Sequence, residues 1–188
     1  MCIQTEETPN PNSLKFLPGQ SVMGDQQPLS FSDSDPCLSS PLARKILEIQ
    51  GITTVFLGSD FITVTKQDQQ DWYILKPLIL GSLMDAFVNG LPILENAVSS
   101  KEEENLFGDK DDPLSRQIRE LIDTRVRPAV AQDGGDIIFR GFQEGVVYLK
   151  MQGACSGCPS SSATLKSGIE NMLKYYVPEV LEVQQSDD

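Results

Sequence analysis

The sequence predicts an α+β protein built from two small domains, and three observations support this fold class. Apolar residues recur at helical spacing in four segments and at strand spacing in several short runs. These segments follow one another in an order that suits helices layered on sheets. A polar, mostly acidic segment, KEEENLFGDKDD at 101–112, then divides the chain. We therefore expect a first domain at 1–98, an acidic linker at 99–112 and a second domain at 113–188.

The first domain is predicted to contain short strands, a helix, a hairpin and a second helix. The helix at 39–51 begins after serines, has Pro41 in its first turn and ends at Gly51, which are start and stop signals. A second helix is expected at 71–90, with Pro77 in its first turn. Strands are predicted at 12–18 and 28–32, and a hairpin at 52–66. The side chains expected to face inward from the second helix are Leu75, Ile79, Leu83, Met84 and Phe87.

The second domain is predicted to run helix–strand–strand–helix–strand. The first helix spans 113–135, and Pro128 should kink or tighten its last turn. Gly168 lies inside the second helix, where glycine is unfavourable, so it is interpreted as a mark of close packing. The remaining predicted elements are a hairpin at 136–153, a helix at 159–177 and a strand at 179–185. The inward residues expected on the two helices are Leu114, Ile118, Leu121, Ile122, Val126, Leu165, Ile169, Met172, Leu173 and Tyr176.

Composition excludes several classes of function. The net charge is −12 and no basic stripe is present, so nucleic acid and anionic membranes are poor partners. No apolar run approaches the roughly 18 residues needed to span a bilayer. Histidine is absent, which excludes a Ser-His-Asp triad, a Cys-His nucleophile and a histidine-ligated metal. We expect no catalytic residues, and metal chemistry would rest on thiolates, carboxylates or carbonyls.

Two of the four cysteines form a Cys-x-x-Cys pair, Cys155 and Cys158, in the segment GACSGCPSS. The pair falls between a predicted strand and a helix opened by Pro159, and a helix N-terminus lowers the pKa of nearby thiols. A purely structural pair is an unfavoured interpretation, because adjacent thiols in a reducing cell rarely serve packing alone. A redox couple fits the local geometry, but the domain lacks the opening βαβ unit of that fold. A zinc site and an iron–sulfur site both remain open.

Two thiolates are half of the four ligands that zinc or an iron–sulfur cluster normally takes. Cys2 and Cys37 are isolated in the other domain, and we interpret both as ordinary thiols. A symmetric dimer that apposes two identical pairs would supply four thiolates with one operator. We favour that arrangement, with Cys155 and Cys158 of each chain as the metal ligands.

The residues DGGDIIF and GVVYLKMQGACSGCPSSSATLKSGIENMLKYYVPEV resemble the C-terminal domain of the NifU/Nfu family of iron–sulfur cluster scaffold and carrier proteins. The likeness covers most of 114–184, and IQTEETPNPNSLKFLPG at 3–19 similarly resembles the family's N-terminal domain. It implies a cluster, commonly four-iron four-sulfur, bridged between two subunits by Cys155 and Cys158. It also implies delivery to apo-protein clients and loading by upstream assembly factors.

Two smaller expectations concern the start of the chain and the end of its third predicted helix. The first residues show neither a secretory signal nor the presequence of mitochondrial family members, so we expect a bacterial, cytoplasmic protein. Asp133, Gly134, Gly135 and Asp136 are interpreted as a helix-ending turn with left-handed glycines. Transient metal binding by the two aspartates is the alternative.

Overall fold

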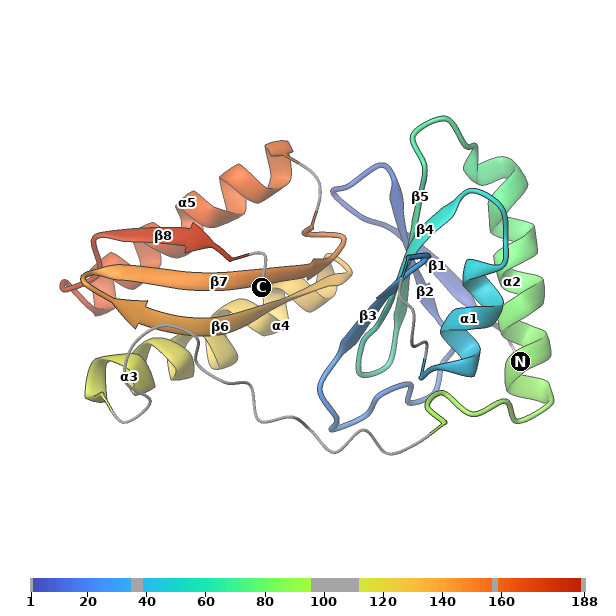
Figure 1. Cartoon of the computed structure of the whole chain (residues 1–188), viewed down its shortest axis with the longest axis horizontal. Coiled ribbons are helices and arrows are strands. Elements are labelled where there is room, and N and C mark those ends of the chain that lie inside the picture. Colours follow the sequence, from blue (N-terminus) through green and yellow to red (C-terminus); the bar gives the residue numbers. More distant parts are fainter. Residues whose placement is uncertain (1, 35–38, 96–111, 157–158, 187–188) are drawn as a thin grey trace. The chain divides into compact units, whose positions relative to one another are not determined.

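The structure is a computed structural model that describes residues 2–34, 39–95, 112–156 and 159–186, without the side chains of 159–161. The chain divides into two compact units, Met1–Ser100 and Lys101–Asp188. Each unit is a sheet packed against helices, so the predicted α+β class is confirmed (Figure 1). The linker predicted at 99–112 lies outside the described residues except for Asp112, and the domain boundaries stay a prediction.

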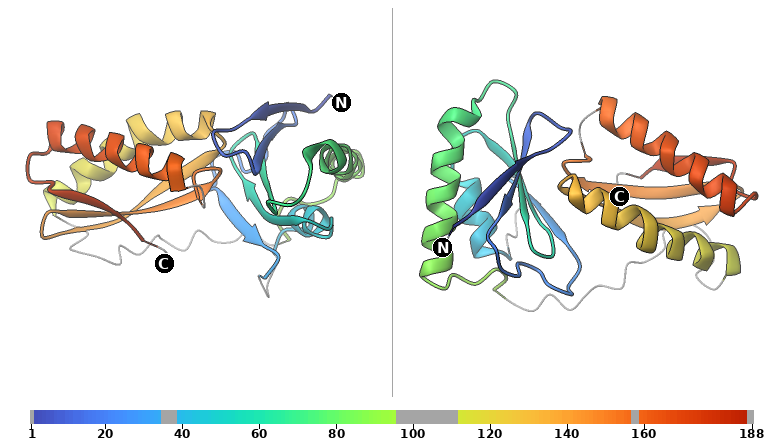
Figure 2. Two further views of the ribbon diagram at one scale, coloured as in Figure 1. Left: turned by 90° about the horizontal axis from the view of Figure 1, so that it is seen from above. Right: turned by 180° about the vertical axis from the view of Figure 1, so that it is seen from behind.

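The first unit is a five-stranded antiparallel sheet with both of its helices on one face (Figure 2). The strands lie in the order β1-β2-β5-β4-β3. The elements are β1 (Gln4–Glu7), β2 (Ser13–Leu17), β3 (Leu29–Ser32), α1 (Pro41–Leu47), β4 (Ile52–Leu57), β5 (Ile62–Lys66) and α2 (Trp72–Val88). The predicted strands, hairpin and helices are all present, and β1 is an additional edge strand.

Side-chain caps fix where the two helices of the first unit begin. The Ser40 hydroxyl accepts a hydrogen bond from the Ala43 amide at 3.1 Å, and Pro41 is the first residue of α1. The Asp71 carboxylate accepts from the Tyr73 amide at 2.9 Å at the start of α2. Pro77 lies inside α2 beyond its first turn, so that prediction is wrong. The missing N–H of proline leaves one carbonyl in the preceding turn without a helical donor.

Helix α2 is apolar around its circumference. It buries Leu75, Ile79, Leu83 and Ala86 against the sheet. Met84, predicted to face inward, is 41% exposed, so that prediction is wrong. Periodicity does not identify the buried side of a helix that is apolar all round, which explains the error.

The second unit is a three-stranded sheet with its helices on one face (Figure 2). Strands β6 and β7 form an antiparallel hairpin, and β8 pairs with β7 in parallel. A parallel pair needs a crossover connection, which α5 provides. The elements are α3 (Pro113–Leu121), η1 (Ile122–Val126), α4 (Arg127–Gln132), β6 (Gly135–Gln143), β7 (Val146–Gly153), α5 (Pro159–Tyr176) and β8 (Glu182–Gln185). This is the predicted helix–strand–strand–helix–strand order.

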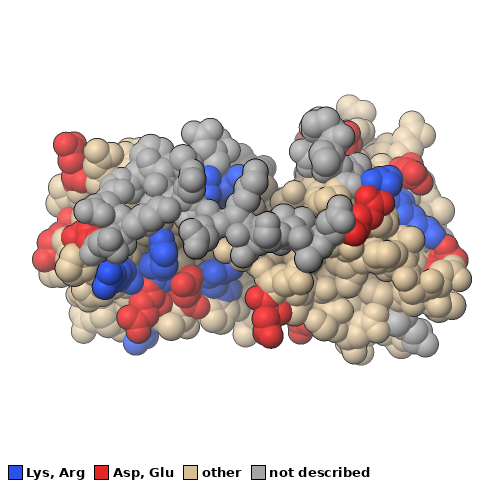
Figure 3. Space-filling view, turned by 60° about the horizontal axis from the view of Figure 1, so that its bottom comes forward, with Lys and Arg blue, Asp and Glu red and all other residues tan. Residues whose placement is uncertain are grey.

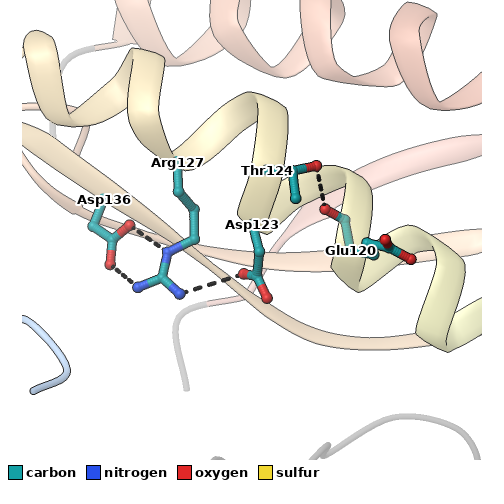
Figure 4. Close-up of polar contacts among 5 residues, drawn as sticks. All are labelled: Glu120, Asp123, Thr124, Arg127 and Asp136. Carbon is teal, nitrogen blue, oxygen red and sulfur yellow. Dashed lines mark hydrogen bonds and ion pairs between the residues drawn. The ribbon is translucent and has the colours of Figure 1, made fainter. Parts of the chain in front are cut away.

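The helix predicted at 113–135 is interrupted in its middle rather than tightened in its last turn. Segment η1 is π-helical and separates α3 from α4. Pro128 follows it directly and has no N–H to donate to the carbonyl four residues earlier, that of Thr124. The Thr124 hydroxyl instead donates to the Glu120 carbonyl at 2.6 Å (Figure 4). A break in the ladder next to a proline is a common setting for such a turn.

Two expectations for α5 are wrong. Tyr176 was expected to face inward, but it is 39% exposed and its ring lies 4.9 Å from the Arg125 guanidinium. Gly168 was expected to mark close packing, but no atom lies within 4 Å of a Cβ built there. Ile169 and Leu173 are buried as predicted.

The surface carries charges of both signs. On the face drawn in Figure 3, basic side chains lie beside acidic ones. Within the first unit, Arg44 and Glu95 form an ion pair at 3.6 Å, and Lys45 pairs with Asp85. Across the described ranges, no helix is long and apolar enough to cross a membrane.

Candidate functional site

Cys155 lies just beyond β7, in a short loop tied back onto the β6–β7 hairpin. The amide of Ala154 donates to the Gly134 carbonyl at 3.2 Å, and the amide of Ser156 donates to the Gly153 carbonyl at 3.1 Å. Gly153 has φ +67°, in the left-handed region that favours glycine. The loop therefore leaves the sheet by a sharp turn that places Cys155 beside the start of β6.

The thiol is packed rather than presented to solvent. Cys155 is 7% exposed and belongs to the apolar core of the second unit. Gly135 lies directly against it, because a Cβ built on Gly135 would stand 2.6 Å from Sγ of Cys155. The same Cβ would stand 2.8 Å from the Gln152 carbonyl oxygen. Residue 135 must therefore lack a side chain for the cysteine to occupy this position.

The surroundings of Cys155 disfavour the thiolate. Burial, followed by the negative charges of Asp133 and Asp136, raises the pKa of the Cys155 thiol to about 12. The expectation of a lowered pKa at this thiol is wrong, because burial and the two carboxylates raise it. A metal ion that binds this sulfur must displace a proton.

Asp136 is held by Arg127 in a two-pronged ion pair (Figure 4). Nε and Nη2 of Arg127 donate to the two carboxylate oxygens at 2.9 and 2.8 Å, while Nη1 lies 3.3 Å from Asp123. The Asp136 side chain is buried, and its carboxylate holds the pKa of Arg127 well above its usual range. The clamp joins the end of the helical segment to the first residues of β6. Both oxygens of Asp136 have donors, which disfavours its interpretation as a metal ligand.

The turn expected at 133–136 is confirmed in part. Gly134 has φ +80° and ends α4 as a left-handed residue. Gly135 does not have a positive φ, and its role is to make room for Cys155. Sequence reasoning found neither that contact nor the Arg127–Asp136 pair. The ion pair could have been inferred from an arginine that lies nine residues before an aspartate, with a helix-ending turn between them.

The other candidate ligands contribute little to the described geometry. Cys158 and Cys37 lie outside the described residues. Cys2 is exposed in the first unit. Within the part of the chain that the structure describes, no group of three or more Cys, Asp or Glu side chains could hold a metal ion. Cys155 is therefore a single soft donor, and a metal site here would need further ligands.

A separate pocket of about 520 Å³ lies within the first unit, between β1, β2 and the start of α2. Glu7, Asn10, Trp72 and Lys76 are among its lining residues. The Trp72 indole N–H donates to the Pro11 carbonyl at 2.9 Å and helps to shape it. No cysteine lines this pocket, so it has no part in thiol chemistry.

Both units match family models. The NifU-like domain matches residues 118–184, and the scaffold protein Nfu/NifU N-terminal domain matches residues 3–90. The first match contains Cys155, Gly135 and the Arg127–Asp136 clamp. The second contains the whole sheet of the first unit and α2.

Curated relatives align along the full chain. The mitochondrial NFU1 iron-sulfur cluster scaffold homolog of Homo sapiens is 49% identical over 189 residues, covering 100% of this chain and 73% of the relative. The protein of that name in Drosophila erecta is 48% identical over 188 residues, and this chain spans 66% of its length. A solution structure of a NifU-like protein from Saccharomyces cerevisiae is 28% identical, with a TM-score of 0.47, over 51% of this chain and 86% of that one.

These relatives correct the expected location. Their names describe them as mitochondrial, and they come from animals, so the expectation of a bacterial, cytoplasmic protein is wrong. That expectation rested on the first residues of the chain. Those residues do not identify the compartment.

The cysteine motif, the loop that holds Cys155 and the matches over both units lead to one family. The human relative is nearly half identical and is covered over more than two thirds of its length. The chain belongs to the NifU/Nfu family of iron–sulfur cluster scaffold proteins.

Proposed function

We propose that the protein is an iron–sulfur cluster scaffold and carrier. It binds a cluster between two copies through Cys155 and Cys158 of each, and it delivers that cluster to apo-protein clients. The observation that carries the proposal is the position of Cys155, a soft donor held at the end of a hairpin with Gly135 packed against it. The cluster is cargo, so the role is binding and transfer rather than catalysis.

The number of donors supports two copies. Clusters held by protein thiolates normally take four of them. One chain offers Cys155 and Cys158, and no described group of side chains supplies the rest. A two-fold dimer supplies four thiolates from one repeated surface. A cluster that bridges two copies loses half of its protein ligands when the copies separate, which suits release to a client. The four-iron four-sulfur type is proposed from the family resemblance.

The chain's own residues fix the first donor before any cargo arrives. Gly135 sets the depth of the Cys155 sulfur, and the Arg127–Asp136 clamp fixes the strand that carries Gly135. Preorganised donors lose less conformational freedom on binding than donors on a free loop. Each Cys–iron bond that forms releases the thiol proton, and each bond that breaks during transfer takes one up.

The two alternatives carry other signatures. A thiol–disulfide protein would form a reversible intramolecular disulfide and stay colourless, and a zinc-stabilised module would be colourless but sensitive to chelators. The family membership favours the scaffold over both.

Anaerobic reconstitution with iron, sulfide and a reductant tests the proposal. We expect visible absorption and about four iron per dimer. Cys155→Ala and Cys158→Ala should abolish both signals, whereas Cys2→Ala is the matched control and should keep them. Normal iron and sulfide content in Cys158→Ala would refute the ligand assignment. Cluster-loaded protein that sediments as a single chain without an added thiol ligand would refute the bridged arrangement.

A further inference from the structure

The pocket between β1, β2 and the start of α2 has the size and the lining of a ligand-binding site. Its volume, about 520 Å³, is within the range of known ligand pockets. Trp72 and two prolines are among its apolar lining residues, while Asn10, Lys76 and Glu7 bring polar groups to it. We call it the β1 pocket, and its polar groups indicate the chemistry of the ligand that it would take.

Asn10 holds a hydrogen-bond donor without a partner in the β1 pocket. The residue is only 5% exposed. Its Oδ1 accepts from the Asn12 amide at 3.0 Å, which fixes the orientation of the side-chain amide. Within the described ranges, Nδ2 of Asn10 makes no hydrogen bond. A nearly buried donor of this kind needs an acceptor from outside the chain.

Lys76 brings a positive charge to the same pocket, where it is half-buried. The other described lysines of the first unit, Lys15, Lys45 and Lys66, each have a carboxylate or amide partner. Among these four, Lys76 has neither a hydrogen bond nor an ion pair with any described residue. An unpaired ammonium and an unpaired amide donor in one pocket are complementary to a carboxylate, which accepts at two oxygens.

The β1 pocket also adjoins an unpaired strand edge. β1 is the outermost strand of its sheet and pairs only with β2 in the described part of the chain. Thr5 and Glu7, which alternate along β1, both line the pocket. A strand added to the free edge of β1 would place every second side chain on the same face as Thr5 and Glu7. Those side chains would therefore lie over the pocket.

We propose that the β1 pocket binds an extended segment of a partner protein that carries one acidic side chain. The segment pairs with the free edge of β1, and its carboxylate accepts hydrogen bonds from Lys76 and Asn10. Backbone pairing supplies affinity, and the pocket supplies selection for the acidic residue. The site lies in the first unit and uses no cysteine, so it adds partner recognition to the proposed cluster binding without depending on it.

Glu7 restricts the choice to a single acidic residue. Its carboxylate is exposed and has no partner among the described residues, Lys76 included. A second carboxylate on the same face of the bound segment would be repelled by Glu7, because like charges on paired strands are unfavourable. The net charge of −12 adds to this repulsion. Segments with one acidic residue among neutral ones should therefore bind better than acidic runs.

Trp72 is the single tryptophan of the chain, so its fluorescence reports directly on the β1 pocket. The probe is a capped peptide of valine and threonine residues around one glutamate, added to the full, metal-free, reduced chain up to about 5 mM. We expect a saturable change in emission. The glutamine version of the peptide should bind about tenfold more weakly or worse, because it lacks the charge-assisted hydrogen bonds.

Variants of the pocket test the assignment of the donors. Lys76→Gln should lower the affinity for the glutamate peptide by about tenfold and remove the preference over the glutamine peptide. Lys150→Gln is the matched control, because it removes the same charge from a half-buried lysine of the second unit. Asn10→Asp keeps the acceptor for the Asn12 amide but replaces the donor by a negative charge, so it should also lose binding. Glu7→Gln should raise the affinity, most of all for a peptide with two glutamates, and circular dichroism should show every variant folded.

Two further probes separate a peptide from smaller ligands. Succinate offers carboxylates without a strand and should bind about tenfold more weakly than the glutamate peptide, or worse. Of two peptides N-methylated on alternate sets of backbone amides, one should lose binding and the other keep it, because only one set faces β1.

The proposal is overturned by the absence of a saturable signal, by equal affinities for the glutamate and glutamine peptides, or by Lys76→Gln protein that binds like wild type. Succinate that binds as tightly as the peptide would also overturn it and would assign the pocket to small carboxylates. The protein used carries no metal, so each of these failures would leave the proposed cluster binding untouched.

Discussion

Gly135 packs so closely against Cys155 that a β-carbon at residue 135 would lie 2.6 Å from the cysteine sulfur. Carbon and sulfur do not approach this closely without a bond, so any larger residue must move the thiol or the strand. The same β-carbon would lie 2.8 Å from the Gln152 carbonyl oxygen, so it could not be accommodated by a shift toward the backbone of β7 either. The first residue of β6 therefore determines where the sulfur can be.

Gly135→Ala should displace Cys155 and lower the iron retained per chain after reconstitution. Overpacking of this kind should also destabilise the second unit by about 1–3 kcal/mol. Urea unfolding and iron analysis measure the two effects. Gly168→Ala serves as the control, because its Cβ position is open and alanine favours a helix by up to about 1 kcal/mol. An alanine at 135 that leaves both iron content and stability unchanged would contradict the packing argument.

Arg127→Gln should destabilise the second unit by about 2–4 kcal/mol, because it leaves the buried Asp136 carboxylate without its partner. Asp123→Asn removes only the exposed arm of the network and should cost no more than about 0.5 kcal/mol. The double variant Arg127→Gln/Asp136→Asn should recover part of the loss, since neither charge is then unpaired. Urea unfolding of all four proteins measures this, and equal losses for Arg127→Gln and Asp123→Asn would contradict it.

Alkylation of Cys155 in the metal-free protein should be slow at neutral pH and should accelerate as the pH rises toward about 12. The raised pKa keeps the thiol protonated in the folded state. Its contribution to stability is therefore complete below the ordinary value of 9.0 and is lost as the pH rises through the folded value. Iodoacetamide labelling in a Cys158→Ser background, followed by mass spectrometry, gives the rate. The urea-unfolded protein is the reference, and an equal rate in both states at pH 8 would refute the effect.

Glu170 ties α5 to β8, and the tie should weaken in acid. Its carboxylate accepts from the Val183 amide at 3.1 Å and from Lys174 at 2.6 Å, and the lysine first and the amide second lower the pKa of Glu170. A lowered pKa adds stability above the ordinary value of 4.5, and this is lost as the pH falls through the folded value. Hydrogen exchange at the Val183 amide should quicken in Glu170→Ala but not in Lys174→Ala. Glu170→Gln should keep the hydrogen bond and show a smaller acid loss than wild type.

Much of the fold could be predicted because local signals agreed with one another. Helix α1 has its serine cap and first-turn proline, and the β4–β5 and β6–β7 hairpins have clear apolar runs. Strand β1 gave no such signal, because QTEE is polar and mostly exposed, and its place at the sheet edge depends on pairing with β2. Met84 was misplaced for the converse reason, since an apolar helix has no obvious inner side.

The strand that leads to Cys155 could be predicted from the sequence, but the environment of the thiol could not. The apolar pattern before Cys155 correctly predicted the strand that leads to it, β7. The direction in which the Cys155 pKa is shifted depends on burial in the folded protein and on two carboxylates. The Cys-x-x-Cys spacing reveals neither of them. The contact with Gly135 arises because Gly135 pairs with Gly153 across the hairpin, a register that no local pattern reveals.

The π-helical turn η1 determines which side chains of the following helix, α4, face the core. Ile118, Ile122, Val126 and Val130 are all buried and fall every fourth residue. In a continuous α-helix each step of four overshoots a full turn by about 40°, so the last would have rotated away from the first. The wider turn absorbs this rotation. Val126 and Val130 therefore stay in the core while Arg127, between them, still pairs with Asp136. Loss of a single residue from 122–126 would turn the rest of the helix by about 100°. A deletion in this segment should therefore do more damage than a substitution at one of its exposed positions, Asp123, Thr124 or Arg125.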